Sequence, residues 1–406
     1  MDSSPVEVAD HGGSRTSHGA RLRVILAPSA YYPNIGGIEE LTRQLATALA
    51  ARGHRVTVLT NRWPATTARI EVLDGVTVTR LDFPLPASRP AAAARFAARF
   101  PSATARLYEH LRKANPDVVH VIGAGPQAAY IAMFRRLLRA RVVLTAQGEL
   151  AFDAHGVFER SSTMRTALRK LLRDADAVTA CSHFVLDQLR SFAPIRPPQS
   201  VVPNGVDPDE LSINRSESPM APTHVVAFGR LVPQKGFDVL LDAFACTELE
   251  SLRLTIAGEG LERGRLTTKI QELGLQGRAR LPGAVDRKGL RELLAMADVF
   301  ALPSRAEPFG IALLEAMAAG VPAVATRAGG VTEFAQHGEN ALLVGVENPR
   351  ELAYAISRLT MDDGLRARLT ANGLKTAGTL SWKRIAAEYE RIYYLTAAPE
   401  TCRRYF

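Results

Sequence analysis

The stretch that most constrains this chain runs from residue 298 to residue 346. It begins with a short apolar run at Val299–Leu302, bounded by turn residues, which predicts a buried strand. A helix is expected to open at Pro308, because proline suits a first helical position, and to stop at Gly320. The first N–H groups of a helix have no partner inside it, so this helix start is suited to binding an anion.

Two carboxylates, Glu307 and Glu315, bracket the start of that helix. A glycoside hydrolase needs its two carboxyl groups about 5–9.5 Å apart. Two residues that lie about eight positions apart along a helix are separated by about 12 Å, so the pair does not suit that dyad. It suits a longer ligand with hydroxyls at both ends and an anionic middle, which is the shape of a nucleotide-activated sugar.

The segment resembles the donor-binding region of retaining glycosyltransferases of family 4, the glycosyl transferases group 1 type. The signature of that family is a Glu, seven intervening residues and a second Glu, inside the pattern PS-x-x-EPFG-x-x-x-LEAMA-x-G-x-P. Glu307 and Glu315 match it position by position, and the similarity extends from about residue 21 to about residue 394. The resemblance implies an α/β chain of GT-B architecture, in which two Rossmann-like domains face each other across a cleft.

The resemblance also implies a reaction. A sugar would pass from a nucleotide-diphosphate-sugar, with UDP- or GDP-sugars expected, to an acceptor hydroxyl with retained anomeric configuration. Glu307 would hold the hydroxyls of the donor sugar, and Glu315 those of the ribose. The acceptor is unknown at this stage, and polysaccharide, glycolipid and secondary-metabolite biosynthesis all stay open.

Length and cysteine content set further bounds. At 406 residues the chain has room for two domains, and it contains no apolar run long enough to span a membrane. Residues 1–20 are rich in Ser, Gly and His and predict a disordered tail without the apolar stretch of a secretory signal. The scattered Cys181, Cys246 and Cys402 give neither a disulfide framework nor a metal spacing, which favours a reducing cytoplasm.

The net charge of +9 is compatible with nucleic acid, an anionic membrane surface or a phosphate-rich substrate. Basic residues gather at Pro90–Lys113 and Phe134–Arg141. The first segment could lie on an anionic bilayer as an amphipathic helix, although a solvated helix is the favoured interpretation. No basic stretch is interleaved with aromatic residues, so nucleic acid is not expected as a partner.

The first half of the chain reads as a parallel α/β unit. An apolar run at Arg21–Ala30 is followed by a loop with Gly36 and Gly37, an amphipathic helix and a second strand at Val56–Thr60. This order is a βαβ unit, and a further strand followed by a loop is expected within Pro116–Gly125 and again within Arg141–Leu150. In the family that the chain resembles, the loop of Gly36 and Gly37 lies near the donor phosphates and the acceptor.

Three motifs in this half are interpreted as structural. Gly123-Ala-Gly125 imitates a dinucleotide-binding loop, but no acidic residue ends a following strand at the required distance. The Asp-x-Asp spellings at Asp174–Asp176 and Asp207–Asp209 imitate metal-binding motifs, but neither directly follows an apolar strand. No metal site is therefore predicted.

The second half begins after a polar, proline-containing linker at residues 214–223. The predicted organisation is a tail at 1–20, an N-terminal acceptor-side domain at 21–213 plus 380–398, and a C-terminal donor-binding domain at 214–379. The last helix is expected to open at the cap Ser381, and the resemblance implies that it crosses back onto the first domain.

Arg230 and Lys235 share one short loop after a predicted strand, at the strand end where α/β sheets bind ligands. In the family, an Arg and a Lys in a GR-x-x-x-x-KG setting neutralise the diphosphate. These cations, with the helix start at Phe309 and Gly310, would stabilise the charge that develops on the leaving group. The donor-binding set predicted with them adds these residues: Gly36, Gly37, Gly229, Val285, Glu307, Ile311 and Glu315.

The expected catalytic set is Glu307, Arg230, Lys235 and Gln147. Many relatives carry His where this chain has Gln147, and a glutamine can hydrogen-bond but cannot act as a general base. His155 is the nearest histidine that could substitute. Without a paired-carboxylate dyad, the departing phosphate oxygen is expected to take the acceptor proton, with no metal or cofactor required.

Three other functions remain open from the sequence. A phosphorylase of the same architecture would use phosphate in place of the nucleotide, and a nucleotide-sugar epimerase would form no glycoside. A binding-only homologue is disfavoured because Arg230, Lys235, Glu307 and Glu315 are all present. A peripheral contact of the basic first domain with an anionic membrane also stays open beside a cytoplasmic location.

Overall fold

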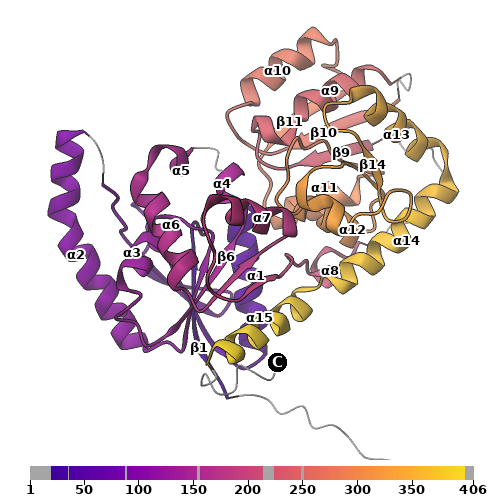
Figure 1. Cartoon of the computed structure of the whole chain (residues 1–406). Helices are drawn as coiled ribbons and strands as arrows, with labels where there is room; N and C mark the ends of the chain where they lie inside the picture. Colours follow the sequence, from indigo (N-terminus) through magenta and orange to yellow (C-terminus); the bar gives the residue numbers. More distant parts are fainter. Residues whose placement is uncertain are drawn as a thin grey trace, which may run out of the picture.

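The computed structural model describes residues 20–34, 36–86, 89–152, 156–213, 224–247 and 251–397. The predicted tail apart from Ala20, the predicted linker, His155 and Cys402 lie outside these ranges. The chain forms two α/β domains that face each other, each with its own sheet (Figure 1). The predicted fold class is confirmed.

The N-terminal sheet is parallel except at one edge, where β3 runs antiparallel to β4. The hairpin of β3 and β4 was not predicted, and it turns at Asp74 and Gly75, both with positive φ. The central strands are short apolar runs that are buried along most of their length. The strands, in sheet order, are β3 (Ile70–Leu73), β4 (Val76–Leu81), β2 (Arg55–Asn61), β1 (Arg23–Pro28), β5 (Val118–Ile122), β6 (Arg141–Ala146), β7 (Ala177–Ala180) and β8 (Gln199–Val201).

Helices connect these strands in the right order for parallel crossovers. They are α1 (Gly37–Ala51), α2 (Pro90–Ala114), α3 (Pro126–Phe134), α4 (Glu149–Phe152), α5 (Val157–Arg160), α6 (Ser162–Asp174), α7 (His183–Phe192) and α8 (Pro208–Leu211). The short α4 begins where the sequence predicted only a loop after the strand.

The C-terminal sheet is parallel throughout. Its strands, in sheet order, are β11 (Ala279–Gly283), β10 (Arg253–Ala257), β9 (His224–Phe228), β12 (Val299–Leu302), β13 (Ala323–Thr326) and β14 (Leu342–Val344). Its helices are α9 (Phe237–Ala245), α10 (Arg263–Glu272), α11 (Arg287–Ala295), α12 (Ile311–Ala318), α13 (Pro349–Met361) and α14 (Asp363–Thr379), with short 3-10 turns η1 (Pro233–Lys235) and η2 (Gly329–Glu333).

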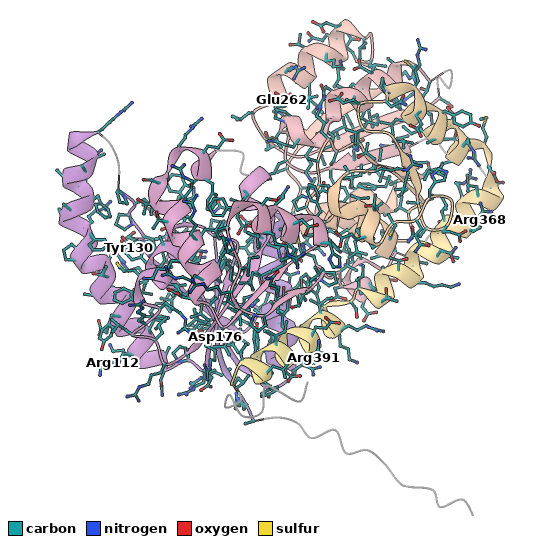
Figure 2. The ribbon with its side chains drawn as sticks, viewed as in Figure 1. Arg112, Tyr130, Asp176, Glu262, Arg368 and Arg391 are labelled. Carbon is teal, nitrogen blue, oxygen red and sulfur yellow. The ribbon has the colours of Figure 1, made fainter. Side chains whose placement is uncertain are left out.

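The long helix α2 buries an apolar stripe and exposes its basic side chains. Ala103, Leu107 and Leu111 are buried in the same core as Tyr130. Arg112 is exposed at the outer end of the helix (Figure 2). The apolar stripe in the C-terminal half of α2 is therefore covered by protein, which agrees with the favoured interpretation of a solvated helix. No helix in the described ranges combines the length and the apolar character needed to cross a bilayer.

The two Asp-x-Asp spellings have structural roles. Asp176 accepts hydrogen bonds from the Arg135 and Arg141 guanidinium groups at 2.6 and 3.2 Å. Asp207 caps α8, because its side chain accepts from the backbone N–H of Asp209 and Glu210. Among the described residues, no group of three or more His, Cys, Asp and Glu side chains is placed to hold a metal ion.

The last helix, α15 (Trp382–Ala397), begins directly after Ser381 and returns to the N-terminal domain, where it packs along α1 (Figure 1). Its Tyr389 and Tyr393 are almost fully buried in the same core as residues of β1, β5 and β6.

His120, on β5, lies at the centre of a buried polar network that this helix completes. Its Nδ1 lies 2.7 Å from the Tyr393 hydroxyl, and its Nε2 lies 2.5 Å from the Thr145 hydroxyl. The Thr145 hydroxyl in turn lies 2.5 Å from that of Thr179. Burial lowers the pKa of His120 to about 3. The network ties α15 to the end of β6, the strand that leads into Gln147.

We expect His120 to make stability depend on pH. The folded state holds the imidazole neutral, whereas the unfolded chain protonates it at about pH 6.5. The contribution is therefore complete above about pH 6.5 and is lost as the pH falls toward the folded value, by up to about 1.4 kcal/mol per unit. Urea unfolding of the wild type and of His120→Gln between about pH 7.5 and about pH 5 measures this. The difference between the two proteins should shrink with falling pH, and a constant difference would contradict the assignment.

Candidate functional site

A cleft of about 1080 Å³ lies between the two domains. It is lined by loops that follow the carboxyl ends of β1, β5 and β6 on one wall and of β9, β10 and β12 on the other. This is the edge at which open α/β sheets bind ligands. Every site residue predicted from the sequence lines the cleft except Gly310, which lies between the lining residues Phe309 and Ile311.

The loop of residues 307–310 precedes α12, which begins three residues after the position predicted from the sequence. The helix begins at Ile311, and the expected start at Pro308 is wrong. Gly310 is the N-cap with a φ of 107°, a conformation that a residue with a side chain rarely adopts. The Pro308 carbonyl lies outside the helix and accepts a hydrogen bond from the Ser182 hydroxyl of the other domain at 2.6 Å.

Gly329 and Gly330 hold this loop from behind. A Cβ atom at Gly329 would lie 2.2 Å from the Glu307 carbonyl oxygen, and one at Gly330 would lie 2.2 Å from that of Pro308. The Gly330 N–H donates to the Glu307 carbonyl at 3.0 Å. Any side chain at either glycine would push the loop away, so the glycine pair positions the Glu307 backbone.

Glu307 and Lys235 meet inside the cleft. The Lys235 Nζ lies 2.7 Å from the Glu307 Oε2, and the Ser304 hydroxyl donates to the same oxygen at 3.0 Å. Gly236 lets the η1 turn approach, because a Cβ there would lie 2.1 Å from the Pro303 carbonyl oxygen. The fold thus brings into contact two predicted donor-binding residues that lie 72 positions apart in the sequence.

Arg287, which the sequence did not single out, joins carboxylates from both domains. Its guanidinium lies 2.5 Å from Glu315 in the C-terminal domain, and 2.9 and 3.5 Å from Glu210 and Glu40 in the N-terminal domain. Burial raises the pKa of Glu315 although Arg287 opposes the rise. Burial alone would also raise the pKa of Glu40, but Arg43 and Arg287 lower it to about 2. Glu315, predicted for the ribose, is therefore paired with Arg287.

We expect Arg287→Met to destabilise the protein by about 3 kcal/mol, because it leaves three partly buried carboxylates without their shared cation. Lys288→Met is the matched control. Lys288 is the next residue of α11, its side chain is 85% exposed, and its ion pair with Glu292 spans 3.8 Å. That substitution should change the free energy of unfolding by less than about 0.5 kcal/mol. Equal effects of the two substitutions in urea unfolding would remove the special role of Arg287.

Gln147 forms a reciprocal amide pair with Asn204. The Gln147 Nε2 donates to the Asn204 Oδ1 at 3.2 Å, and the Asn204 Nδ2 donates to the Gln147 Oε1 at 3.0 Å. Asn204 is 3% exposed and was not predicted from the sequence as a site residue. Glu149 fixes the Gln147 backbone by accepting its N–H at 2.7 Å and that of Ala124 at 2.7 Å.

Gln147→Ala is expected to slow turnover about three- to a few hundred-fold, because it removes the hydrogen-bonding amide and leaves the buried Asn204 amide unsatisfied. Asn204→Ala should act in the same range. If the two amides work as one unit, the double variant will be less impaired than the product of the two single effects. Single-turnover rates decide this, and wild-type chemistry in Gln147→Ala would show that the loop is only structural.

Two family models match the chain. The model described as Glycosyltransferase Family 4 matches residues 35–210, and the model described as Glycosyl transferases group 1 matches residues 209–376. The chain belongs to this glycosyltransferase family. One relative is N-acetyl-alpha-D-glucosaminyl L-malate synthase of Bacillus anthracis. It is 28% identical over 382 residues, which cover 89% of this chain and 95% of that protein.

Solved structures of glycosyltransferases share the fold. Sucrose-phosphate synthase from Thermosynechococcus elongatus superposes with a TM-score of 0.78 at 24% identity, covering 91% of this chain and 98% of that one. Anabaena Alr3699/HepE in complex with UDP-glucose superposes with a TM-score of 0.74 at 21% identity, covering 91% and 99%. These superpositions show the GT-B fold. The two family models and the curated relative show that the chain is a glycosyltransferase.

Proposed function

We propose that this glycosyltransferase moves a sugar from a nucleoside-diphosphate-sugar to an acceptor hydroxyl with retention of anomeric configuration. The observation that carries the proposal is the placement of Lys235 and Glu307 in contact, 2.7 Å apart, beside the start of α12. Arg230 lines the same wall of the cleft. The solved structure of Anabaena Alr3699/HepE is a complex with UDP-glucose, and this supports a donor of the same kind.

The chemistry on this wall is electrostatic. Cleavage of the glycosyl–phosphate bond leaves the electron pair and a negative charge on the diphosphate, and Arg230, Lys235 and the N–H groups at Gly310 are placed to stabilise it. When the phosphate binds Lys235, the Glu307 carboxylate becomes available to accept hydrogen bonds from the hydroxyls of the donor sugar. The acceptor proton goes to the departing phosphate oxygen, because the amide of Gln147 cannot act as a base.

Glu315 would accept the ribose hydroxyls. Its carboxylate accepts a hydrogen bond from Arg287 at 2.5 Å, so a ribose would join or displace that contact. Arg287 is also held by Glu210 and Glu40, which keeps the guanidinium in place while the ribose exchanges.

Lys235→Ala should weaken nucleotide binding about 10- to 150-fold, since the loss of a charge-assisted hydrogen bond to phosphate costs about 1.5–3 kcal/mol. Calorimetric titration with UDP-, GDP- and ADP-sugars measures the affinity. Lys375→Ala, an exposed position on α14, is the control and should leave the affinity unchanged. Unchanged affinity in Lys235→Ala would refute the placement of the diphosphate.

The proposal includes no metal or cofactor, with the phosphate charge neutralised by Arg230 and Lys235. Activity should therefore survive excess EDTA. Transfer rates measured with and without chelator test this, and complete loss that Mg²⁺ or Mn²⁺ restores would contradict it.

A further inference from the structure

The two walls of the cleft carry different charge. On the C-terminal wall, four cationic side chains balance four carboxylates: Arg230, Lys235, Arg287 and Lys288 against Glu259, Asp286, Glu307 and Glu315. The described residues of the N-terminal wall carry five carboxylates and one guanidinium: Glu39, Glu40, Asp74, Glu149, Glu210 and Arg43. The wall opposite the proposed diphosphate site is therefore strongly acidic, although the chain as a whole has a net charge of +9.

Most of these carboxylates already have partners. Arg43 lies 2.8 Å from Glu40, 3.1 Å from Asp74 and 3.2 Å from Glu210. The Glu149 carboxylate accepts hydrogen bonds from the backbone N–H groups of Ala124 and Gln147. The single guanidinium of this wall is thus fully engaged and is not available to an incoming anion.

Glu39 differs from the others. It lies in the first turn of α1, it lines the cleft, and it is 8% exposed. Its carboxylate is bonded to its own backbone N–H, and no other described residue donates a hydrogen bond to it. Burial raises its pKa, while Arg230 on the facing wall acts on it electrostatically and opposes the rise. A largely desolvated carboxylate with unused acceptor capacity therefore faces the cavity.

We propose that Glu39 receives a hydroxyl or ammonium group of the acceptor, and that the acceptor is an uncharged or amine-bearing polyol rather than an anion. An acceptor with a carboxylate or phosphate would bring like charge against an acidic wall whose guanidinium is already paired, which disfavours binding. A hydroxyl or ammonium donor would satisfy Glu39, and an ammonium group would form the stronger, charge-assisted hydrogen bond. This inference rests on the proposed function, because it assigns the acceptor of the same reaction.

The test compares acceptors of similar size that carry different charges. The donor is whichever nucleotide-sugar binds in the calorimetric screen, and release of its nucleoside diphosphate is measured with methyl glucoside, glucosamine, glucuronate and glucose 6-phosphate, and with a set of neutral and amine-bearing cyclitols. Stimulated release is expected only from uncharged and amine-bearing members. Faster release with the anionic members, or none with any uncharged or amine-bearing member, would overturn the acceptor class.

Glu39→Gln tests the residue. It should lower kcat/KM for an amine-bearing acceptor at least tenfold more than for its uncharged counterpart, while the affinity for nucleotide changes less than about twofold. Glu109→Gln, at an exposed ion pair on α2, is the matched control and should leave kcat/KM for both acceptors unchanged. Equal losses for both acceptors in Glu39→Gln would overturn the role of this carboxylate.

The proposed function and the acceptor inference would be contradicted by different results. Absence of nucleotide binding and of donor cleavage in the wild type would remove the proposed function itself. Nucleotide binding together with a preference for anionic acceptors would leave that function standing and remove only the acceptor inference.

Discussion

The guanidinium of Arg287 joins carboxylates of the two domains across the cleft. Within one side chain it contacts Glu315 on α12 and two carboxylates of the N-terminal domain, Glu210 and Glu40. Ion pairs of this kind have strict geometry, so they fix the approach of α11 and α12 to α1. The result is close contact between the walls, since a Cβ at Gly37 would lie 3.5 Å from Ile311.

The local signals in the sequence predicted much of the fold. Apolar runs bounded by turn residues gave β12 with its observed limits, and the cap Ser381 gave the start of α15. The start of α12 was misjudged because proline is compatible with a first helical position, while the three-dimensional contacts of Pro308 hold its carbonyl outside the helix. The hairpin of β3 and β4 was missed although its Asp74-Gly75 turn, between alternating residues, is a strong local hairpin signal.

The residues of the site also fall into two groups, those that the sequence predicted and those that it did not. Lys235 and Glu307 belong to sequence-local motifs, and the structure brings them into contact. Arg287 and Asn204 could not be found from spacing, because each acts through partners from distant segments: the amide pair of Gln147 and Asn204 joins residues 57 positions apart. A glutamine in place of histidine was visible in the sequence. Its hydrogen bonding to the buried Asn204 amide was not.

The charge difference between the walls bears on how the proposed reaction is oriented. A nucleotide-sugar carries its charge on the diphosphate, which is attracted to the cations of the C-terminal wall and repelled by the carboxylates of the N-terminal wall. The donor must also compete with Glu307 for Lys235, and a diphosphate offers more charge to that ammonium than one carboxylate does. In the proposed donor complex, Lys235 would turn from Glu307 toward the phosphate, and the phosphate would weaken the electrostatic attraction between Arg230 and Glu39. Donor binding would therefore prepare both carboxylates to accept hydroxyl groups, one from each substrate, so that the acceptor binds best after the donor.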